Sequence, residues 1–356
     1  MSRIYNKDLT SVIVASGTKQ DPLVLEGIVR KLDNVLFLCW TGGGKSEPCC
    51  DNVTLYRRSF DGGRSWTETK ILFAHPHKGI FTPALFVNDK TLYAFPNSYY
   101  NHTAFCEDMQ SYYSISSDLG ETFSIPRSIA GCINNIHIKC TLKVDNRWIF
   151  ACSWREIGTD IWASFHDQNK ECVVAGNVFE NPNLDAWQWY NSHPEYCGVL
   201  ISDDNGNSFK ICGRIGGENR SFVEPMMTTL SDGTFIMLLR TNEHRLYESR
   251  SYDGGETWTA PIPTDIPSAI TKVLLLKDSA GKIYLLHNPN PIDLARNPLS
   301  LWISDDDMKC WGKKIELIRD DNAPLCYPDG FIDESRGKLC FAWDDRKNIY
   351  YSEFPI

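Results

Sequence analysis

An eight-residue motif recurs five times along the chain and constrains the fold more than any other feature. It follows the pattern Ser-x-Asp-x-Gly-x-Thr/Ser-Trp/Phe and occupies residues 59–66, 116–123, 202–209, 251–258 and, in degraded form, 304–311. Ser and Asp side chains can bond to backbone amides of a tight turn, Gly adopts the positive φ that the turn needs, and the closing aromatic residue re-enters a packed layer. The motif, hereafter the Asp-box, therefore predicts a hairpin turn that is built repeatedly.

The spacing of the Asp-boxes predicts one small sheet per repeat. Their first serines lie at 59, 116, 202, 251 and 304, giving intervals of 57, 86, 49 and 53 residues. Between them the chain forms short apolar runs, such as 34–40 and 233–239, that are rich in β-branched and aromatic residues and too short for helices. A sixth unit without a box follows residue 320. We expect an all-β six-bladed β-propeller with Asp-box repeats, closed by pairing the N-terminal segment with the last blade.

One domain accounts for the whole length. A repeat fold uses 356 residues as a single unit, so we expect one propeller over 1–356. The 86-residue interval predicts an insertion in blade three at about 155–196, which is either a cover over a ligand site or a surface loop with its own aromatic cluster.

Charge and cysteine content exclude several classes of function. A net charge of −9 makes nucleic acid and anionic membrane poor partners, and no apolar stretch resembles a secretory signal or a membrane span, so we expect a cytoplasmic protein. Thirteen scattered cysteines favour reduced thiols over a disulfide framework. The sequence lacks Cys-x-x-Cys, His-Glu-x-x-His, Gly-x-Gly-x-x-Gly and calcium-loop motifs, so we expect no metal and no cofactor. The oligomeric state stays open.

The repeat register locates a candidate site. The starting end of each innermost strand faces the propeller axis, where ligands usually bind, and counting back from the following turn gives one position per blade. These positions are Glu26, 81–82, His137, Glu224, 270–271 and Tyr327. Taken singly, such residues are more typical of hydrogen-bonded or packed side chains. Together they place groups suited to proton transfer or nucleophilic attack on one ring.

The boxes and the ring residues together resemble the sialidase superfamily, whose members are six-bladed propellers with Asp-boxes. The matching features are Glu224 to Arg240 followed by a box, Arg296 just upstream of another box, and Tyr327 in a blade without one. The resemblance implies that Tyr327 attacks the anomeric carbon while Glu224 removes its proton, and that Arg240 and Arg296 bind an anionic group. It also implies an acid in blade one, for which Asp51 is the candidate, with Glu47 and Glu26 nearby in sequence.

The chain departs from the sialidase pattern in its first blade. An Arg-Ile-Pro motif of the family supplies a third arginine there, whereas residues 24–29 read Val-Leu-Glu-Gly-Ile-Val and place Glu26 at that position. Asp344 falls where the family has an acidic partner for this arginine. Candidate replacements for the missing positive charge are His137, Lys139, Arg155 and Arg346. The sequences of blades one, three, five and six resemble uncharacterised sialidase-like proteins more than established sialidases.

Three functions follow from the resemblance and the residues. The leading hypothesis is a retaining exo-glycosidase that cleaves a terminal acidic sugar such as sialic acid, so the expected partner is a glycan or sugar-acid substrate. A second is a polysaccharide lyase in which His137 or a tyrosine abstracts the proton next to a uronate carboxylate. The third is a glycan-binding propeller without catalysis, which the missing arginine favours.

Overall fold

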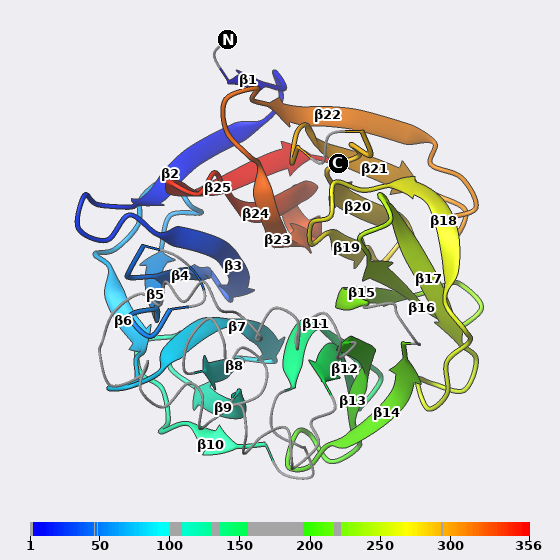
Figure 1. Cartoon of the computed structure of the whole chain (residues 1–356), viewed down its shortest axis with the longest axis horizontal. Helices are drawn as coiled ribbons and strands as arrows, with labels where there is room; N and C mark the ends of the chain where they lie inside the picture. Colours follow the sequence, from blue (N-terminus) through cyan, green and yellow to red (C-terminus); the bar gives the residue numbers. More distant parts are fainter. Residues whose placement is uncertain are drawn as a thin grey trace, which may run out of the picture.

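The described residues form six antiparallel sheets around a central axis. The computed structural model of the chain describes residues 3–45, 47, 49–99, 109–129, 136–155, 195–216, 222–292 and 295–356. Viewed down the axis, the sheets are arranged radially, with β3, β7, β11, β15, β19 and β23 innermost (Figure 1). The predicted six-bladed β-propeller is confirmed. Residues 156–194 lie outside the described residues, and so does most of the insertion expected at 155–196.

Each blade is built from consecutive antiparallel strands. Blade one contains β3 (Val24–Leu32), β4 (Val35–Gly42), β5 (Val53–Ser59) and β6 (Lys70–Phe73). Blade two contains β7 (Gly79–Asn88), β8 (Thr91–Tyr99), β9 (Gln110–Ser116) and β10 (Arg127–Ser128). Blade three contains β11 (His137–Val144), β12 (Arg147–Arg155), β13 (Glu195–Ser202) and β14 (Lys210–Ile215). Blade four contains β15 (Val223–Thr229), β16 (Phe235–Arg240), β17 (Arg245–Ser251) and β18 (Ile262–Pro267).

The N-terminal segment completes the last two blades. Blade five contains β19 (Leu274–Lys277), β20 (Ile283–His287), β21 (Leu299–Ser304) and β22 (Lys313–Arg319), with β1 (Ile4–Tyr5) added at its outer edge. Blade six contains β23 (Cys326–Asp333), β24 (Lys338–Asp344) and β25 (Asn348–Pro355), with β2 (Thr10–Ser16) outermost. The pairing of β2 with β25 is the predicted closure, because it joins the first strands of the chain to the last blade.

The first Asp-box shows why the motif repeats. Ser59 Oγ donates to Asp61 Oδ1 at 2.8 Å and accepts from the Gly63 amide at 2.8 Å, while Asp61 also accepts from Ser65. Gly63 has a φ of +88°, and a Cβ there would lie 2.2 Å from the ring of Tyr351 in blade six. The box therefore closes its own turn and also packs its blade against the preceding one.

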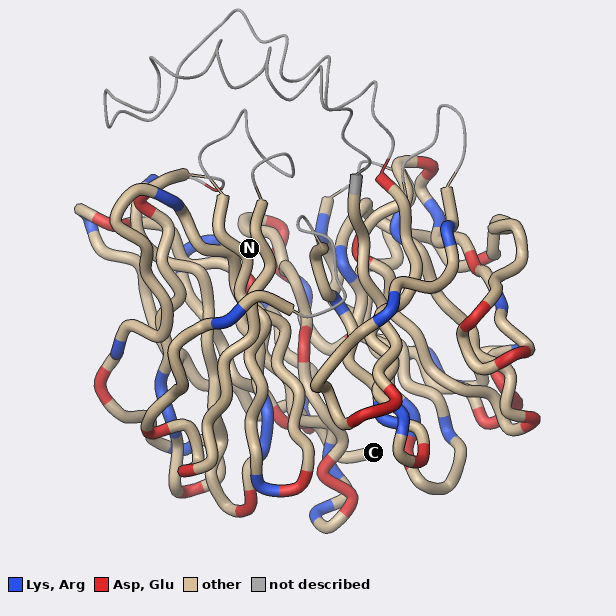
Figure 2. Tube along the Cα trace, turned by 90° about the horizontal axis from the view of Figure 1, so that it is seen from below, with Lys and Arg blue, Asp and Glu red and all other residues tan. Residues whose placement is uncertain are grey.

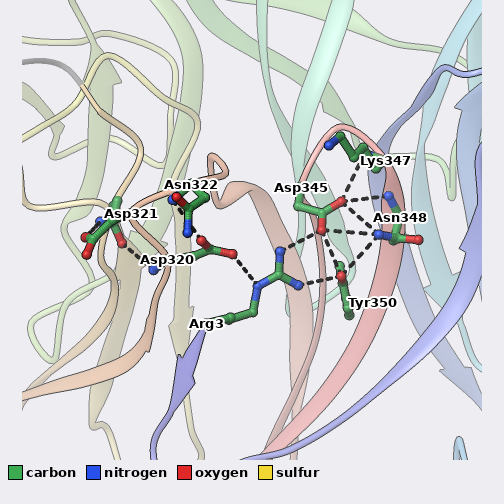
Figure 3. Close-up of polar contacts among 9 residues, drawn as sticks. Arg3, Asp320, Asp321, Asn322, Asp345, Lys347, Asn348 and Tyr350 are labelled. Atoms are coloured by element: carbon green, nitrogen blue, oxygen red, sulfur yellow. Dashed lines mark hydrogen bonds and ion pairs between the residues drawn. The ribbon is translucent and has the colours of Figure 1, made fainter. Parts of the chain in front are cut away.

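Arg3 fastens the closure through a polar network (Figure 3). Its guanidinium donates to Asp320 Oδ2 in blade five at 2.8 Å and to Asp345 Oδ2 in blade six at 2.6 Å. It also donates to the hydroxyl of Tyr350 and packs over the rings of Trp343 and Tyr350 at 5.2 and 4.9 Å. One side chain from the start of the chain thus joins blades five and six, the two blades that the N-terminal segment completes.

Replacing Arg3 with methionine is expected to destabilise the propeller by roughly 2–3 kcal/mol, because Asp345 would stay buried without its charged partner. Chemical denaturation monitored by tryptophan fluorescence measures the loss. The control is Arg319→Met, an exposed arginine of β22 whose pair with Glu316 is worth little. Equal stability of the two variants would contradict a role for Arg3 in closure.

The outer surface carries charges of both signs. Basic and acidic residues are interspersed over the described blades (Figure 2). Within the same ranges, no helix has the length and apolar character needed to cross a bilayer, and no cluster of His, Cys, Asp and Glu forms a metal site. The distinctive charges are those buried at the axis.

Candidate active site

A shared backbone conformation brings four residues of different blades to the axis. Glu26, Glu224, Ile270 and Tyr327 have φ values of 53°, 48°, 52° and 48°, in the left-handed region. Three of them lie within register shifts of the inner strands, between Leu25 and Ile28, Val223 and Met226, and Cys326 and Asp329. β-Bulges of this kind turn a side chain away from its regular face. Ile270 has the same conformation although its side chain is apolar. The conformation is therefore a property of the repeated backbone and does not depend on which residue occupies the position.

Glu26 reaches across the axis and binds two lysines. Its Oε1 lies 3.3 Å from Lys139 Nζ of blade three and 3.1 Å from Lys272 Nζ of blade five, and all three side chains are buried. Lys272 lies 3.8 Å from Asp329, which pairs with Arg30 at 2.5 Å. Burial opposes ionisation of Glu26, but Lys139 and Lys272 outweigh it and lower the pKa of Glu26 to about 2.

Glu224 and Arg240 form a second buried pair, within blade four. Arg240 donates to Glu224 Oε2 at 2.5 Å. Burial by itself would raise the pKa of Glu224, but the positive charges of Arg240 and then Lys139 lower it below its ordinary value. Glu224 is therefore an ionised carboxylate at neutral pH, able to accept a proton.

Tyr327 lies among cations from several blades. The guanidinium of Arg296 packs over its ring at 4.7 Å and that of Arg346 at 5.2 Å. Tyr327 also lies within electrostatic range of Lys139 and Arg240, whose protonated forms it favours. Two guanidiniums thus pack on the phenol ring, with two further cations within electrostatic range of it, an arrangement suited to a transition state that places negative charge on the phenol oxygen.

The acidic residues of blade one differ in their surroundings. Asp51 is exposed, and its carboxylate lies 3.9 Å from Cys49 Sγ. Glu47 Oε1 is buried and has no hydrogen-bond partner among the described residues. Burial, reinforced by the negative charge of Glu26, raises the pKa of Glu47 to about 8. The structure thus brings Glu47, rather than Asp51, into range of the charges at the axis.

Asp344 and His137 are two further buried titratable residues of the site. Asp344 is buried and accepts hydrogen bonds from the backbone amides of Glu26 and Arg346, at 3.0 and 3.1 Å. Its burial raises its pKa to about 6. His137 stacks on Phe81 with ring centroids 5.2 Å apart, and burial together with Lys139 lowers its pKa to about 3. His137 is therefore neutral at pH 7.

The axis is more positive than the chain as a whole. At pH 7 six cations and four ionised carboxylates lie near the axis. Glu47 is not counted among these carboxylates because it is largely protonated. The cations are Arg30, Lys139, Arg240, Lys272, Arg296 and Arg346, and the carboxylates are Glu26, Glu224, Asp329 and Asp344. A positive centre in a chain of net charge −9 favours an anionic ligand at the axis.

Sequence reasoning missed Lys272 and Asp329. Both stand two residues after a ring position, as Lys139 stands two residues after His137, so the repeat register contains the signal. The side chain of Arg155, proposed as a replacement for the missing arginine, lies outside the described part of the chain.

Replacing Glu26 with glutamine is expected to destabilise the fold by roughly 3 kcal/mol, because two buried ammonium groups lose their shared carboxylate. The pKa of Glu26 is lowered in the folded state, so its stabilisation is present above about pH 4.5 and is lost as the pH falls toward 2. Denaturation at several pH values should show the difference from wild type shrinking in acid. Glu316→Gln on the surface is the control, and a pH-independent difference would contradict the ionised pairing.

Comparisons with known proteins agree with this architecture. A family model described as BNR repeat-like domain matches residues 34–340. The anhydrosialidase of Macrobdella decora is 24% identical over 165 residues, which cover 42% of this chain and 21% of that protein's length. A Dyadobacter fermentans protein of unknown function has a TM-score of 0.73 at 15% identity, covering 99% of this chain and 100% of its own.

A characterised enzyme shares the fold. The Trypanosoma rangeli sialidase has a TM-score of 0.67 at 13% identity, covering 98% of this chain and 60% of its own. Structures of that sialidase hold sialic acid and the inhibitor DANA.

Proposed function

The chain belongs to the BNR repeat-like domain family of sialidase-superfamily propellers, and we propose that it is a retaining exo-glycosidase that removes a terminal acidic sugar from glycans. Its distant sialidase relatives suggest a glycosidase-type function. The observation that supports the finer proposal concerns Tyr327 and the ionised carboxylate Glu224, which occupy equivalent positions of their blades. Arg296 and Arg346 pack on the phenol ring of Tyr327, and Lys139 and Arg240 lie within electrostatic range of it.

The proposed reaction begins with attack by Tyr327 on the anomeric carbon. Its hydroxyl proton passes to Glu224, and the bond from the anomeric carbon to the leaving oxygen breaks as the new carbon–oxygen bond forms. The cations around Tyr327 favour the charge that develops on the phenol oxygen, and a neutral nucleophile avoids repulsion by a substrate carboxylate. Water then attacks the anomeric carbon of the glycosyl–tyrosine intermediate, the bond to the phenol oxygen breaks, and Glu224 returns its proton to Tyr327. Two inversions therefore retain the configuration.

The leaving oxygen needs a proton, and Glu47 is the group best suited to supply it. Its pKa of about 8 keeps it protonated at neutral pH, as a general acid requires. Glu47 then deprotonates the attacking water in the second step. The exposed position of Asp51, the candidate from sequence, gives it no comparable advantage.

The positive axis supports an acidic substrate over a neutral one. Arg296, stacked on Tyr327, can hold a carboxylate close to the reacting carbon. The lyase alternative with His137 as the base is less well supported, because the imidazolium that it would form is buried and lies close to the positive charge of Lys139.

The test is to assay the purified protein on glycosides of sialic acid and of uronic acids, following product configuration by NMR. Release of free sugar whose first-formed anomer has the configuration of the substrate is the expected result. An unsaturated product that absorbs in the near ultraviolet would identify a lyase, and tight binding on a glycan array without turnover would identify a binding propeller. Either result would overturn the proposal.

A further inference from the structure

Two guanidiniums at the axis, those of Arg296 and Arg346, form no ion pair with a carboxylate in the part of the chain that the structure describes. Arg296 donates to Cys326 Sγ at 3.5 Å and to the Ile270 carbonyl at 3.4 Å, which are weak contacts. Burial opposes the charge of each guanidinium, but Tyr327 and Cys326 outweigh burial and raise the pKa of both. Asp344 adds to this effect at Arg346. Both guanidiniums pack on the Tyr327 ring, at 4.7 and 5.2 Å.

The other four cations at the axis are paired with three carboxylates. Arg240 is paired with Glu224, and Arg30 is paired with Asp329. Lys139 and Lys272 share Glu26. Arg296 and Arg346 pack on the same phenol ring, so their positive charges repel each other. An anion that bridges the two guanidiniums removes this repulsion. Arg296 and Arg346 form no ion pair within the described residues and share only the electrostatic influence of Asp344, so they are the guanidiniums best placed to take a ligand anion.

We propose that Arg346, on the turn between β24 and β25, is the second arm of a carboxylate clamp with Arg296 and replaces the arginine that blade one lacks. This inference rests on the proposed function and assigns its substrate carboxylate to the side of blades five and six. Glu26 makes blade one unsuitable for that role, because it places a negative charge there and occupies both nearby lysines.

Arg3 is a positioning residue for this clamp. Asp345, next to Arg346, accepts from Arg3 at 2.6 Å and from the backbone amides of Lys347 and Asn348 at 3.0 and 2.7 Å (Figure 3). Arg346 itself has a φ of +68°, which the turn must maintain. The contact that closes the propeller thus also holds the turn that presents Arg346.

The experiment measures binding of 2-deoxy-2,3-didehydro-N-acetylneuraminic acid and of its methyl ester by calorimetry. Wild type is expected to prefer the acid, and Arg346→Ala should weaken binding of the acid at least about 30-fold while changing ester binding less than about 3-fold. Arg346→Lys should be intermediate, because lysine keeps the charge but not the fork. Arg319→Ala, which removes an exposed charge, should change neither.

Arg3→Met should reduce the preference for the acid over the ester at a temperature where the variant is fully folded. A merely structural loss would weaken both ligands equally, and that result would overturn the positioning role. If Arg346→Ala and Arg346→Lys keep the wild-type preference, the clamp assignment is wrong while the proposed function survives. If wild type shows no preference for the acid and no cleavage of its glycosides, both are wrong.

Discussion

Tyr327→Phe is expected to lower kcat by on the order of 10⁴-fold while leaving the propeller intact, because it removes only the nucleophilic oxygen. The ring that packs against Arg296 and Arg346 is kept, so substrate binding should change little. Steady-state kinetics on a cleavable sialoside, together with thermal unfolding, measure both effects. Mass spectrometry of wild type trapped with a fluorinated substrate should find the sugar on the peptide that contains Tyr327.

Two matched variants make this result specific. Tyr252→Phe removes a hydroxyl from an Asp-box turn where the side chain is 72% exposed, and it should leave activity unchanged. Glu224→Gln keeps a hydrogen-bonding partner for Arg240 but cannot accept the phenolic proton, so it should cost about 10²- to 10⁴-fold. Near-normal turnover by folded Tyr327→Phe would rule out a tyrosine nucleophile.

The fold could be predicted from the sequence because each Asp-box encodes its own turn. The bonds from Ser59 and Asp61 are local, so residue types at fixed spacing specify them without tertiary information. The five boxes, together with a sixth unit that has no box, predict six blades. The pairing of β2 with β25 could be predicted because the first and last segments must pair to close the propeller. The added pairing of β1 with β22 carries no comparable motif and was missed.

The site could be predicted only in part. Register placed Glu26, Glu224 and Tyr327 on one ring because equivalent residues of a repeat occupy equivalent positions. Lys139 and Lys272, which pair with Glu26, lie 113 and 246 residues away from it in the sequence. No local sequence pattern indicates which lysines form these pairs. The protonation of Glu47 depends on burial and on charges from other segments, which a sequence does not display.

Glu26 and Lys139 also influence the pKa of Glu47. The negative charge of Glu26 raises the pKa of Glu47, whereas Lys139 and Arg346 lower it. Glu26 therefore anchors a buried ion cluster and also helps to keep the neighbouring carboxyl protonated. A residue that departs from the sialidase pattern thereby takes part in the electrostatics of the proposed acid.

Glu47→Gln is expected to lower kcat/KM by about 10³- to 10⁴-fold on substrates with poor leaving groups, such as sialyl-lactose, because these require protonation. Aryl sialosides, whose leaving groups are stable as anions, should lose much less in the glycosylation step. For wild type, kcat/KM on sialyl-lactose should fall as the pH rises through about 8, where Glu47 loses its proton, and Glu47→Gln should lack this limb. The matched control is Asp51→Asn on the neighbouring turn, which should keep both activity and pH profile.

A measurement without substrate tests the same assignment. The folded-state pKa of Glu47 is raised from 4.5 to about 8, so folding favours its protonated form. Wild type should therefore lose stability relative to Glu47→Gln as the pH rises from about 4.5 to 8, and denaturation midpoints across that window record the change. A pH-independent difference would show that Glu47 ionises normally. If Asp51→Asn then lost the alkaline limb, the proton donor would be Asp51, and the buried carboxyl beside Glu26 would have no part in the chemistry.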